Sequence, residues 1–380
     1  GGSLEIPFDD GSTKAIGITR VHLEEDAGKS MHGEGGTLVD FNRCGVPLIE
    51  IVSEPDLRNP REAYLYLTNL KQLLQYVDVS DCDMEKGSLR CDANVSIRPV
   101  GEPALGVKTE VKNVNSFRYV EDALAFEIDR QARLTAGGEP VVHETLLWDS
   151  VKGEARPMRS KELSHDYRYF PEPDLEPLEV AGPRREGVFV TLPELPGARV
   201  RRFVEQYAIP AYDAGILTAT RPLADYYEAV IALFDDAKEV SNWIMGELLR
   251  LANEKAEEIV LEPVPRPVAP ADLAALLELK AQGIVSGSAA KEVLAAMVET
   301  GRPPAEIIAE RGLEQVSDVE ALEAEVDAVI REHSGEVTAY RGGKAGLLGF
   351  FVGQVMRRTK GKADPQLVNR LLRERLDGAS

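Results

Sequence analysis

The sequence predicts an α+β protein in which a mixed N-terminal part, rich in antiparallel strands, is followed by a C-terminal part made of helices. Two observations carry this prediction. Before about residue 192, several short segments alternate apolar and polar residues, as half-buried strands do. Beyond the segment Leu192–Pro196, apolar residues recur at helical spacing instead.

Three segments of the first part have the pattern of strands. Val46–Val52 is a run of β-branched and apolar residues that ends at a Ser-Glu-Pro turn. Ser88–Arg98 alternates, and its polar face would carry Arg90, Asp92, Asn94 and Ser96. Val107–Lys112 alternates likewise, and its polar face would carry Lys108, Glu110 and Lys112.

Helices are expected at several places. Arg61–Tyr76 has helical spacing and follows an Asn-Pro pair, a favourable helix start. In the second part, Leu223–Leu233 and Ser241–Leu251 predict two amphipathic helices. The prolines between Glu262 and Pro270 predict a stiff linker. The last helix, Asp364–Leu376, begins with an N-cap and a proline at its first position.

Composition excludes some classes of protein. No apolar run reaches the roughly 18 residues that a membrane span needs, so no membrane contact is expected. Three widely spaced cysteines without a CxxC pair, Cys44, Cys82 and Cys91, support neither a disulfide framework nor a structural zinc. They are expected to be free thiols in a reducing cytoplasm. The length of 380 residues predicts two or three domains.

Charge is distributed unevenly along the chain. The net charge is −20, yet residues 341–380 hold nine basic and three acidic residues, a net charge of +6. The remainder therefore carries −26. An acidic body with a basic C-terminal end predicts a chain whose end meets nucleic acid.

The segment His22–Ser30 contains the fragments of three motifs, and none is complete. A P-loop needs a glycine where Leu23 stands. A zinc deaminase would need a Pro-Cys-x-x-Cys motif after His22-x-Glu24, and a zincin helix would need a second histidine. What remains is three consecutive carboxylates beside Gly-Lys-Ser.

Two interpretations of these carboxylates stay open. With Glu50 and Glu54 on the following strand and turn, they could hold Mg²⁺ with ATP, because Mg²⁺ prefers one or two carboxylates plus phosphate and water oxygens. A run of charges is also typical of a solvated face. The polar faces of the two alternating strands leave the same choice, between the floor of a metal-nucleotide site and a solvated sheet surface.

Seven segments, in this order, resemble the B subunit of aspartyl/glutamyl-tRNA amidotransferases, the GatB family. They are Gly17–Ser30, Asp40–Arg43, Pro47–Asp56, Gly87–Ser96, Lys112–Phe117, Asp166–Asp174 and Leu192–Pro196. The resemblance implies a cradle-like kinase domain at 1–192, a helical domain at 193–315 and a YqeY-like helical tail at 316–380 that contacts tRNA.

The resemblance also implies the chemistry. Together with an amidase subunit and a small third subunit, the A and C subunits of the family, such a chain phosphorylates the side-chain carboxylate of Glu-tRNA(Gln), or of Asp-tRNA(Asn), using ATP and Mg²⁺. Ammonia channelled from the amidase then forms the amide. The alternatives are a non-catalytic role in tRNA docking and assembly, and a stand-alone phosphotransferase.

Roles follow for individual residues. Glu25 and Glu50 match the metal ligands of the family, and both are expected to be catalytic. Asp92 and Asn94 are further catalytic candidates, and Glu110 is a further metal ligand. Lys29, Arg90, Lys108 and Lys112 are expected to contact the nucleotide. The basic residues expected to contact tRNA are Arg341, Lys344, Arg357, Arg358, Lys360, Lys362, Arg370 and Arg373.

One departure from the family pattern is that roughly its first hundred residues have no counterpart here. They include a Gly-Leu-Glu-Val-His motif whose Glu and His also bind the metal in the family. The chain starts with Gly1 rather than Met, as though an upstream part were missing. By itself, the chain is therefore expected to lack kinase activity.

Overall fold

The computed structural model describes residues 2–8, 10–33, 35–158, 182–255, 268–315, 319–359 and 363–378. The chain divides into two compact units, 1–195 and 196–380. All the strands of the described residues belong to the first unit and the second is helical, so the predicted α+β class is confirmed. The division into three domains stays a prediction. The motif Asp166–Asp174, most of the expected proline linker, and Lys360 and Lys362 lie outside the described residues.

The first sheet of unit 1 has the order β1-β2-β5, with both neighbouring pairs antiparallel. Its strands are β1 (Gly2–Pro7), β2 (Thr13–Glu25) and β5 (Pro47–Ser53). β5 confirms the strand predicted before the Ser-Glu-Pro turn. Between β2 and β5, the chain forms a separate antiparallel hairpin of β3 (Lys29–Gly33) and β4 (Gly36–Asp40).

The second sheet has the order β6-β7-β8-β9. Its strands are β6 (Ala93–Val95), β7 (Thr109–Lys112), β8 (Thr145–Asp149) and β9 (Glu154–Pro157). β7 and β8 are parallel and are joined through α2 (Phe117–Ala136), as a parallel pair requires a long crossover. The strand predicted over Ser88–Arg98 was too long. β6 is an edge strand that pairs with only three residues of the short β7, although burial alternates from Leu89 to Val95 as expected.

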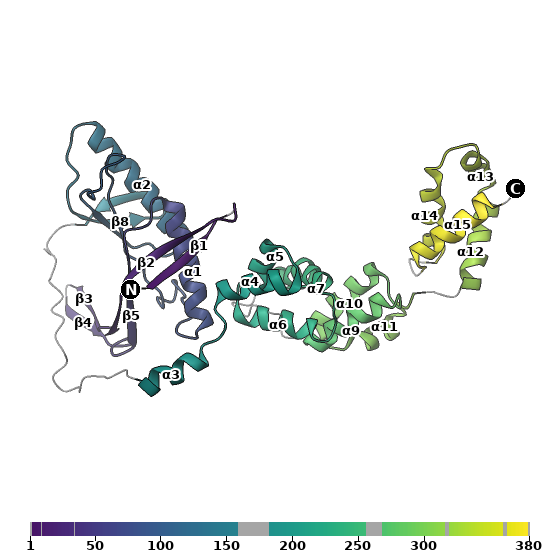
Figure 1. Cartoon of the computed structure of the whole chain (residues 1–380), viewed down its shortest axis with the longest axis horizontal. Helices are drawn as coiled ribbons and strands as arrows, with labels where there is room; N and C mark the ends of the chain where they lie inside the picture. Colours follow the sequence, from purple (N-terminus) through teal and green to yellow (C-terminus); the bar gives the residue numbers. More distant parts are fainter. Residues whose placement is uncertain are drawn as a thin grey trace. The chain divides into compact units, whose positions relative to one another are not determined.

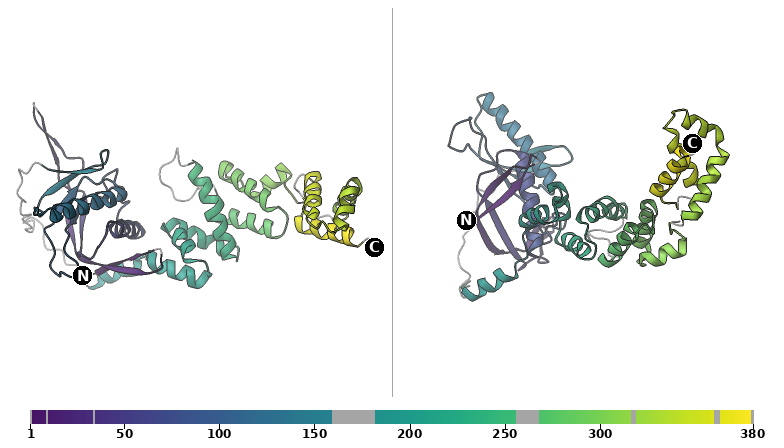
Figure 2. Two further views of the ribbon diagram at one scale, coloured as in Figure 1. Left: turned by 90° about the horizontal axis from the view of Figure 1, so that it is seen from above. Right: turned by 45° about the vertical axis from the view of Figure 1, so that its right-hand side comes forward.

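Helices α1 (Pro60–Tyr76) and α2 pack against each other, and α1 also contacts β1 while α2 contacts β6 and β9 (Figure 1, Figure 2). α1 confirms the helix predicted after the Asn-Pro pair, since Asn59 accepts a hydrogen bond from the Glu62 amide at 2.9 Å. The core between helices and sheets includes Ile6, Ile16, Tyr66, Val111, Val120, Leu146 and Trp148. The described residues of unit 1 also include α3 (Gly182–Thr191).

Unit 2 contains two hydrophobic clusters. The first is formed by α4 (Pro196–Tyr207), α5 (Ala211–Leu217), α6 (Arg221–Ile231), α7 (Ala237–Trp243), a π-helical turn (Ile244–Leu248), α8 (Leu249–Lys255), α9 (Pro270–Ala281), α10 (Gly287–Thr300) and α11 (Pro304–Arg311). The second is formed by α12 (Val319–Glu332), α13 (Ser334–Arg341), α14 (Leu347–Arg358) and α15 (Pro365–Asp377). Within the described residues, no helix is long and apolar enough to cross a membrane.

The predicted helices of unit 2 are confirmed with two differences. Leu233 was expected on the apolar face of the helix starting near Leu223, but α6 ends at Ile231 and Leu233 is 62% exposed in the turn that follows. The helix predicted over Ser241–Leu251 is present but includes a π-helical turn, which adds a residue to one turn. α15 starts as expected, with Asp364 accepting from the Gln366 amide at 2.7 Å.

A buried ion cluster joins α4 to α6. The side chain of Arg199 is 7% exposed and donates to Asp225 at 2.6 Å and to Glu228. Arg202 and the hydroxyl of Tyr207 also donate to Glu228, at 2.6 and 2.8 Å. Burial raises the pKa of Glu228, but the hydrogen bonds from Arg202, Arg199 and Tyr207 outweigh it and lower the pKa to about 2.

We expect Glu228→Gln to lower the free energy of unfolding by about 3 kcal/mol near pH 7, because it removes the carboxylate that Arg199, Arg202 and Tyr207 share and leaves the buried Arg199 to the more exposed Asp225. The pKa of Glu228 is lowered from 4.5 to about 2 in the folded protein. Its contribution is therefore complete above about pH 4.5 and is lost as the pH falls toward 2. Urea unfolding near pH 7 and near pH 3, followed by Trp243 fluorescence in a Trp148→Phe background, measures both effects.

Glu306→Gln is the matched control for this variant. Glu306 pairs with Arg302 at 3.3 Å, with side chains 59% and 42% exposed. Exposed pairs contribute little to stability, so the unfolding midpoint should not move. Equal losses in both variants would contradict the role assigned to Glu228.

Candidate functional site

The pairing of β2 with β5 brings polar side chains onto one face of the first sheet. His22 lies opposite Glu50 in the ladder, and Glu24 lies one strand repeat further along β2. Val21 and Leu23, which alternate with them, are 58% and 71% exposed on the other face. His22 and Glu24 are half-buried, as alternation along a strand requires.

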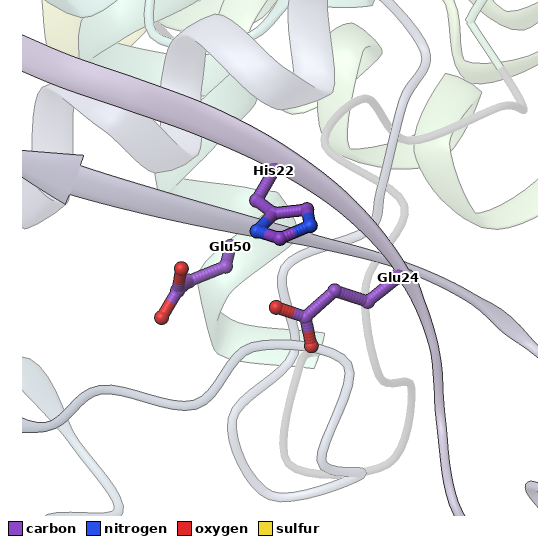
Figure 3. Close-up of side chains that lie close together, drawn as sticks. All are labelled: His22, Glu24 and Glu50. Atoms are coloured by element: carbon purple, nitrogen blue, oxygen red, sulfur yellow. The ribbon is translucent and has the colours of Figure 1, made fainter. Parts of the chain in front are cut away.

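His22, Glu24 and Glu50 form a cluster of possible metal ligands. One ligand atom of each lies within 4.8 Å of the other two. Figure 3 shows the three side chains close together, with His22 and Glu24 on one strand and Glu50 on its neighbour. Glu50 also accepts a hydrogen bond from Arg20 at 3.0 Å. Within the described residues, this is the cluster in which three such side chains converge.

The donor set of this cluster fits a divalent cation. Divalent cations bind oxygen and nitrogen ligands at about 2.0–2.3 Å, so small side-chain rotations would place all three ligand atoms around one ion. Two carboxylates are ligands that suit Mg²⁺ or Mn²⁺, while an imidazole nitrogen adds affinity for Zn²⁺. The side chains of Glu24 and Glu50 supply the negative charge that such an ion needs.

The structure separates Glu25 from this cluster. Glu25 is exposed and lies opposite Pro47, and strand alternation directs its side chain to the face of Val21 and Leu23. Its expected role as a metal ligand stays a prediction, whereas Glu50 does lie among the converging side chains. Lys29, expected to contact the nucleotide, is exposed at the start of the β3–β4 hairpin.

Glu54 and Asp56, in the turn after β5, hold β2 in place. Thr19 donates from its hydroxyl to Glu54 at 2.9 Å, and the Gly17 amide donates to Asp56 at 2.9 Å. A Cβ at Gly17 would come within 2.7 Å of the Glu54 side chain, so the close approach of Glu54 to β2 favours glycine at this position. These contacts flank an irregularity of the ladder between Ile18 and Arg20. Glu54 therefore has a structural partner on β2.

Asp26 binds two arginines. Its side chain is 11% exposed and accepts hydrogen bonds from Arg90 at 2.5 Å and from Arg43 at 2.8 Å. The hydrogen bonds from Arg90 and then Arg43 lower the pKa of Asp26 against the effect of burial. Arg90, expected to contact the nucleotide, is thus joined to the end of β2.

A second polar face lies on β6 and β7, where the two strands present the residues expected from their alternation. Asn94 lies opposite Glu110 in the ladder. Lys112 pairs with Asp92 at 3.2 Å and with Glu110 at 3.6 Å. Burial lowers the pKa of Lys112, but Asp92 and Glu110 outweigh it and raise the pKa. Lys108 is exposed just before β7. Glu110 and Asp92 are not members of the metal-ligand cluster.

Buried polar side chains of α2 form hydrogen bonds with β6 and β7. Glu127 is fully buried and accepts from Thr109 at 2.8 Å and from Arg130 at 2.7 Å. Gln131 donates to the Val95 carbonyl at 3.2 Å and accepts from the amide of residue 97 at 3.1 Å. The amide group of Gln131 therefore replaces the missing neighbour strand of β6, which fixes the position of the edge strand.

Sequence reasoning included Glu24 and Asp26 only as members of a run of three carboxylates, and it did not identify His22 as a possible ligand. A usable signal was present, because Val21–Glu25 alternates with period two and places His22 and Glu24 on one face of a strand. The His-x-Glu pair also begins a zinc deaminase motif, which is incomplete here because no Pro-Cys-x-x-Cys segment follows. Glu50 joins this pair through the register between β2 and β5, which depends on tertiary structure and not on a local sequence pattern.

Two groups can be distinguished among the basic residues of the C-terminal part. Arg358 and Arg375 form ion pairs at 2.7–3.2 Å with residues of α12, namely Glu323, Glu325, Asp327 and Glu332. Lys344, Arg357 and Arg373 are exposed, and within residues 319–359 and 363–378 no ion pair of theirs is described. Arg341 donates to the Leu376 carbonyl at 3.1 Å, and Arg370 lies 4.0 Å from Glu374. None of these contacts tests the expected binding of tRNA.

Comparison with known proteins covers nearly all of the chain. Residues 1–184 match the family described as the GatB/GatE catalytic domain, and residues 225–376 match the family described as the GatB domain. The B subunit of the aspartyl/glutamyl-tRNA(Asn/Gln) amidotransferase of Moorella thermoacetica is 55% identical over 380 residues, which is 99% of this chain and 79% of the relative. The proteins of the same name from Myxococcus xanthus and a Geobacter species are 52% and 49% identical, each over 99% of this chain and 78–79% of the relative. The chain therefore belongs to the family of the B subunit of aspartyl/glutamyl-tRNA(Asn/Gln) amidotransferases.

Proposed function

We propose that this chain is the subunit in which an amidotransferase complex activates the side-chain carboxylate of Glu-tRNA(Gln), Asp-tRNA(Asn) or both. The activation uses ATP and Mg²⁺, and the amide nitrogen is ammonia channelled from an amidase, the A subunit, in a complex that also holds a small C subunit. The observation that carries the proposal is the convergence of His22, Glu24 and Glu50 on one sheet face, in a chain of this family.

The reaction needs activation because a carboxylate is a poor acyl donor. In the first step, a carboxylate oxygen attacks the γ-phosphorus of ATP, and ADP leaves. In the second, ammonia adds to the carbonyl carbon, a proton is lost and inorganic phosphate leaves. Such phosphoryl transfer is catalysed chiefly by positioning and by stabilisation of charge on the phosphate oxygens.

The residues of the chain supply these two effects. His22, Glu24 and Glu50 would hold the divalent cation, which when bound neutralises charge on the phosphates. Lys112, kept protonated by its acidic neighbours, would stabilise charge that develops during transfer. The contacts of Asp92 and Glu110 with Lys112 would orient its ammonium group. Lys29, Arg90 and Lys108 stay candidates for nucleotide contacts, and Asn94 stays a candidate for catalysis.

The neighbouring carboxylates Glu24 and Glu25 give a matched test of the metal site. We expect Glu24→Gln to lower ATP-dependent amidation at least a hundredfold, because it removes a ligand from the cluster. Substitution of a residue that only supports a metal ligand already lowers activity about 10–100-fold. The full-length protein, co-purified with its A and C partners, is assayed on mischarged tRNA over a range of Mg²⁺ and Mn²⁺ concentrations. Glu50→Gln should behave like Glu24→Gln.

Glu25→Gln distinguishes the metal-ligand cluster of the structure, which contains Glu24, from the ligand set that the resemblance implies, which contains Glu25. If the cluster of the structure is the metal site, Glu25→Gln retains most activity; a loss equal to that of Glu24→Gln would place Glu25 in the site instead. Binding of tRNA and assembly with the partners should be unchanged in all these variants. Full amidation by both Glu24→Gln and Glu50→Gln would favour a role in docking and assembly without catalytic residues.

The adjacent residues Arg357 and Arg358 test the tail in the same way. We expect Arg357→Gln to weaken binding of tRNA by severalfold and to reduce the slope of log K against log salt by about 0.7–1, as removal of one phosphate contact does. Arg358→Gln should change affinity less, because its guanidinium is bound to Glu325 and Glu332. Filter binding or fluorescence anisotropy over a salt series measures both.

Removal of residues 341–380 gives the upper limit of the loss in tRNA affinity that a single substitution in the tail can cause. This removal should weaken tRNA binding and flatten the salt dependence more than either single change. Unchanged affinity after the removal would contradict the assignment of tRNA binding to the tail. A larger effect of Arg358→Gln than of Arg357→Gln would contradict the division of the basic residues into two groups.

A further inference from the structure

Asp26 continues the face that carries the metal-ligand cluster. Its amide donates to the Val46 carbonyl at 2.8 Å, and its carbonyl accepts from the Gly45 amide at 3.0 Å, so the β2–β5 ladder extends to it. Like His22 and Glu24, Asp26 is half-buried, while the residues between them are exposed. Two residues along a strand advance about 7 Å, which places Asp26 one repeat beyond Glu24 on the same face.

The carboxylate of Asp26 joins three segments that are distant in sequence. Arg43 donates to it from Nε at 2.8 Å and, from Nη1, donates to the Lys86 carbonyl at 3.3 Å. Arg90 donates to Asp26 from Nη2 at 2.5 Å. Removing this carboxylate would therefore release both arginines from the end of β2.

The two guanidinium groups retain the capacity to bind an anion. Together with Asp26 they carry a net charge of +1, and the side chains of Arg43 and Arg90 are 45% and 60% exposed. A guanidinium has five N–H donors in a fixed plane, of which Asp26 takes one from each arginine. Arginine pairs of this kind suit phosphate, which accepts two parallel hydrogen bonds from one guanidinium.

We propose that Asp26 is a positioning residue that holds Arg43 and Arg90 as a binding pair for the phosphate groups of the nucleotide. The cation site on β2 is followed on the same face by Asp26, which holds the guanidinium pair, and this arrangement suits a metal-bound polyphosphate. Asp26 acts through the arginines, so it takes no part in the reacting bonds. The proposal rests on the proposed ATP-dependent function and adds Arg43 to the residues that contact ATP.

The test uses the full-length protein in complex with its A and C partners and varies ATP at saturating mischarged tRNA and Mg²⁺. We expect Asp26→Asn to raise the KM for ATP about tenfold, which corresponds to the loss of one charge-assisted hydrogen bond, with a smaller change in kcat. The KM for the mischarged tRNA should stay within about twofold. A residue that only braced the fold would lower the melting temperature and leave the KM for ATP unchanged.

Arg90→Lys is the second variant, and it decides the question if Asp26→Asn does not fold. It keeps the charge but loses the planar fork, on a side chain that is 60% exposed. We expect the same rise in the KM for ATP. In the double variant, Asp26→Asn with Arg90→Lys, the effects should not multiply, because residues that act as a unit are not additive.

Asp10→Asn is the matched control. Asp10 also accepts two hydrogen bonds, from the amide and the hydroxyl of Ser12, but it lies in the turn between β1 and β2. The complex that carries Asp10→Asn should have the same KM for ATP as the wild-type complex. An unchanged KM in Asp26→Asn or Arg90→Lys, or effects that multiply in the double variant, would overturn the proposal. A wild-type complex that amidates without ATP would instead refute the proposed function.

Discussion

The register between β2 and β5 is the constraint on which the candidate site depends. It sets His22 opposite Glu50 and leaves Glu24 on the same face. A shift by one residue would turn every side chain of β2 to the other face, so Val21 and Leu23 would replace the ligands. Four hydrogen bonds resist such a shift. Glu54 and Asp56 bind β2 through Thr19 and Gly17 at one end, and Asp26 binds two arginines at the other.

Local patterns in the sequence were sufficient to predict the fold class and several elements, but not the ligand set. The cap at Asn59, the proline after Asp364 and the run before Ser53 each depend on neighbouring residues, and the structure confirms the elements that they predict. Glu50 joins His22 across a loop of more than twenty residues that contains its own hairpin, and no local period encodes that pairing. Similarly, the length of β6 depends on its partner β7, not on its own alternation.

Charged residues that the sequence suggests as ligand-binding groups can already be bound to other charged residues of the chain. Arg358 and Arg375 are part of a basic tail in the sequence, yet both are bound to acidic residues of α12 in the structure. Asp26 belongs to a run of three carboxylates, yet it binds arginines and not the cluster. In a chain of net charge −20, each cation has several possible acidic partners, so net charge over a segment overestimates what can bind a polyanion.

Glu50 has a cationic neighbour that offsets part of the repulsion between it and Glu24. Like charges at this spacing repel each other, and Arg20 compensates part of that repulsion through its 3.0 Å hydrogen bond to Glu50. Since Arg20 and Glu50 are 49% and 40% exposed, their pair is weak and water screens it. If His22, Glu24 and Glu50 hold a divalent cation, Glu50 would exchange this weak contact with Arg20 for a contact with the ion.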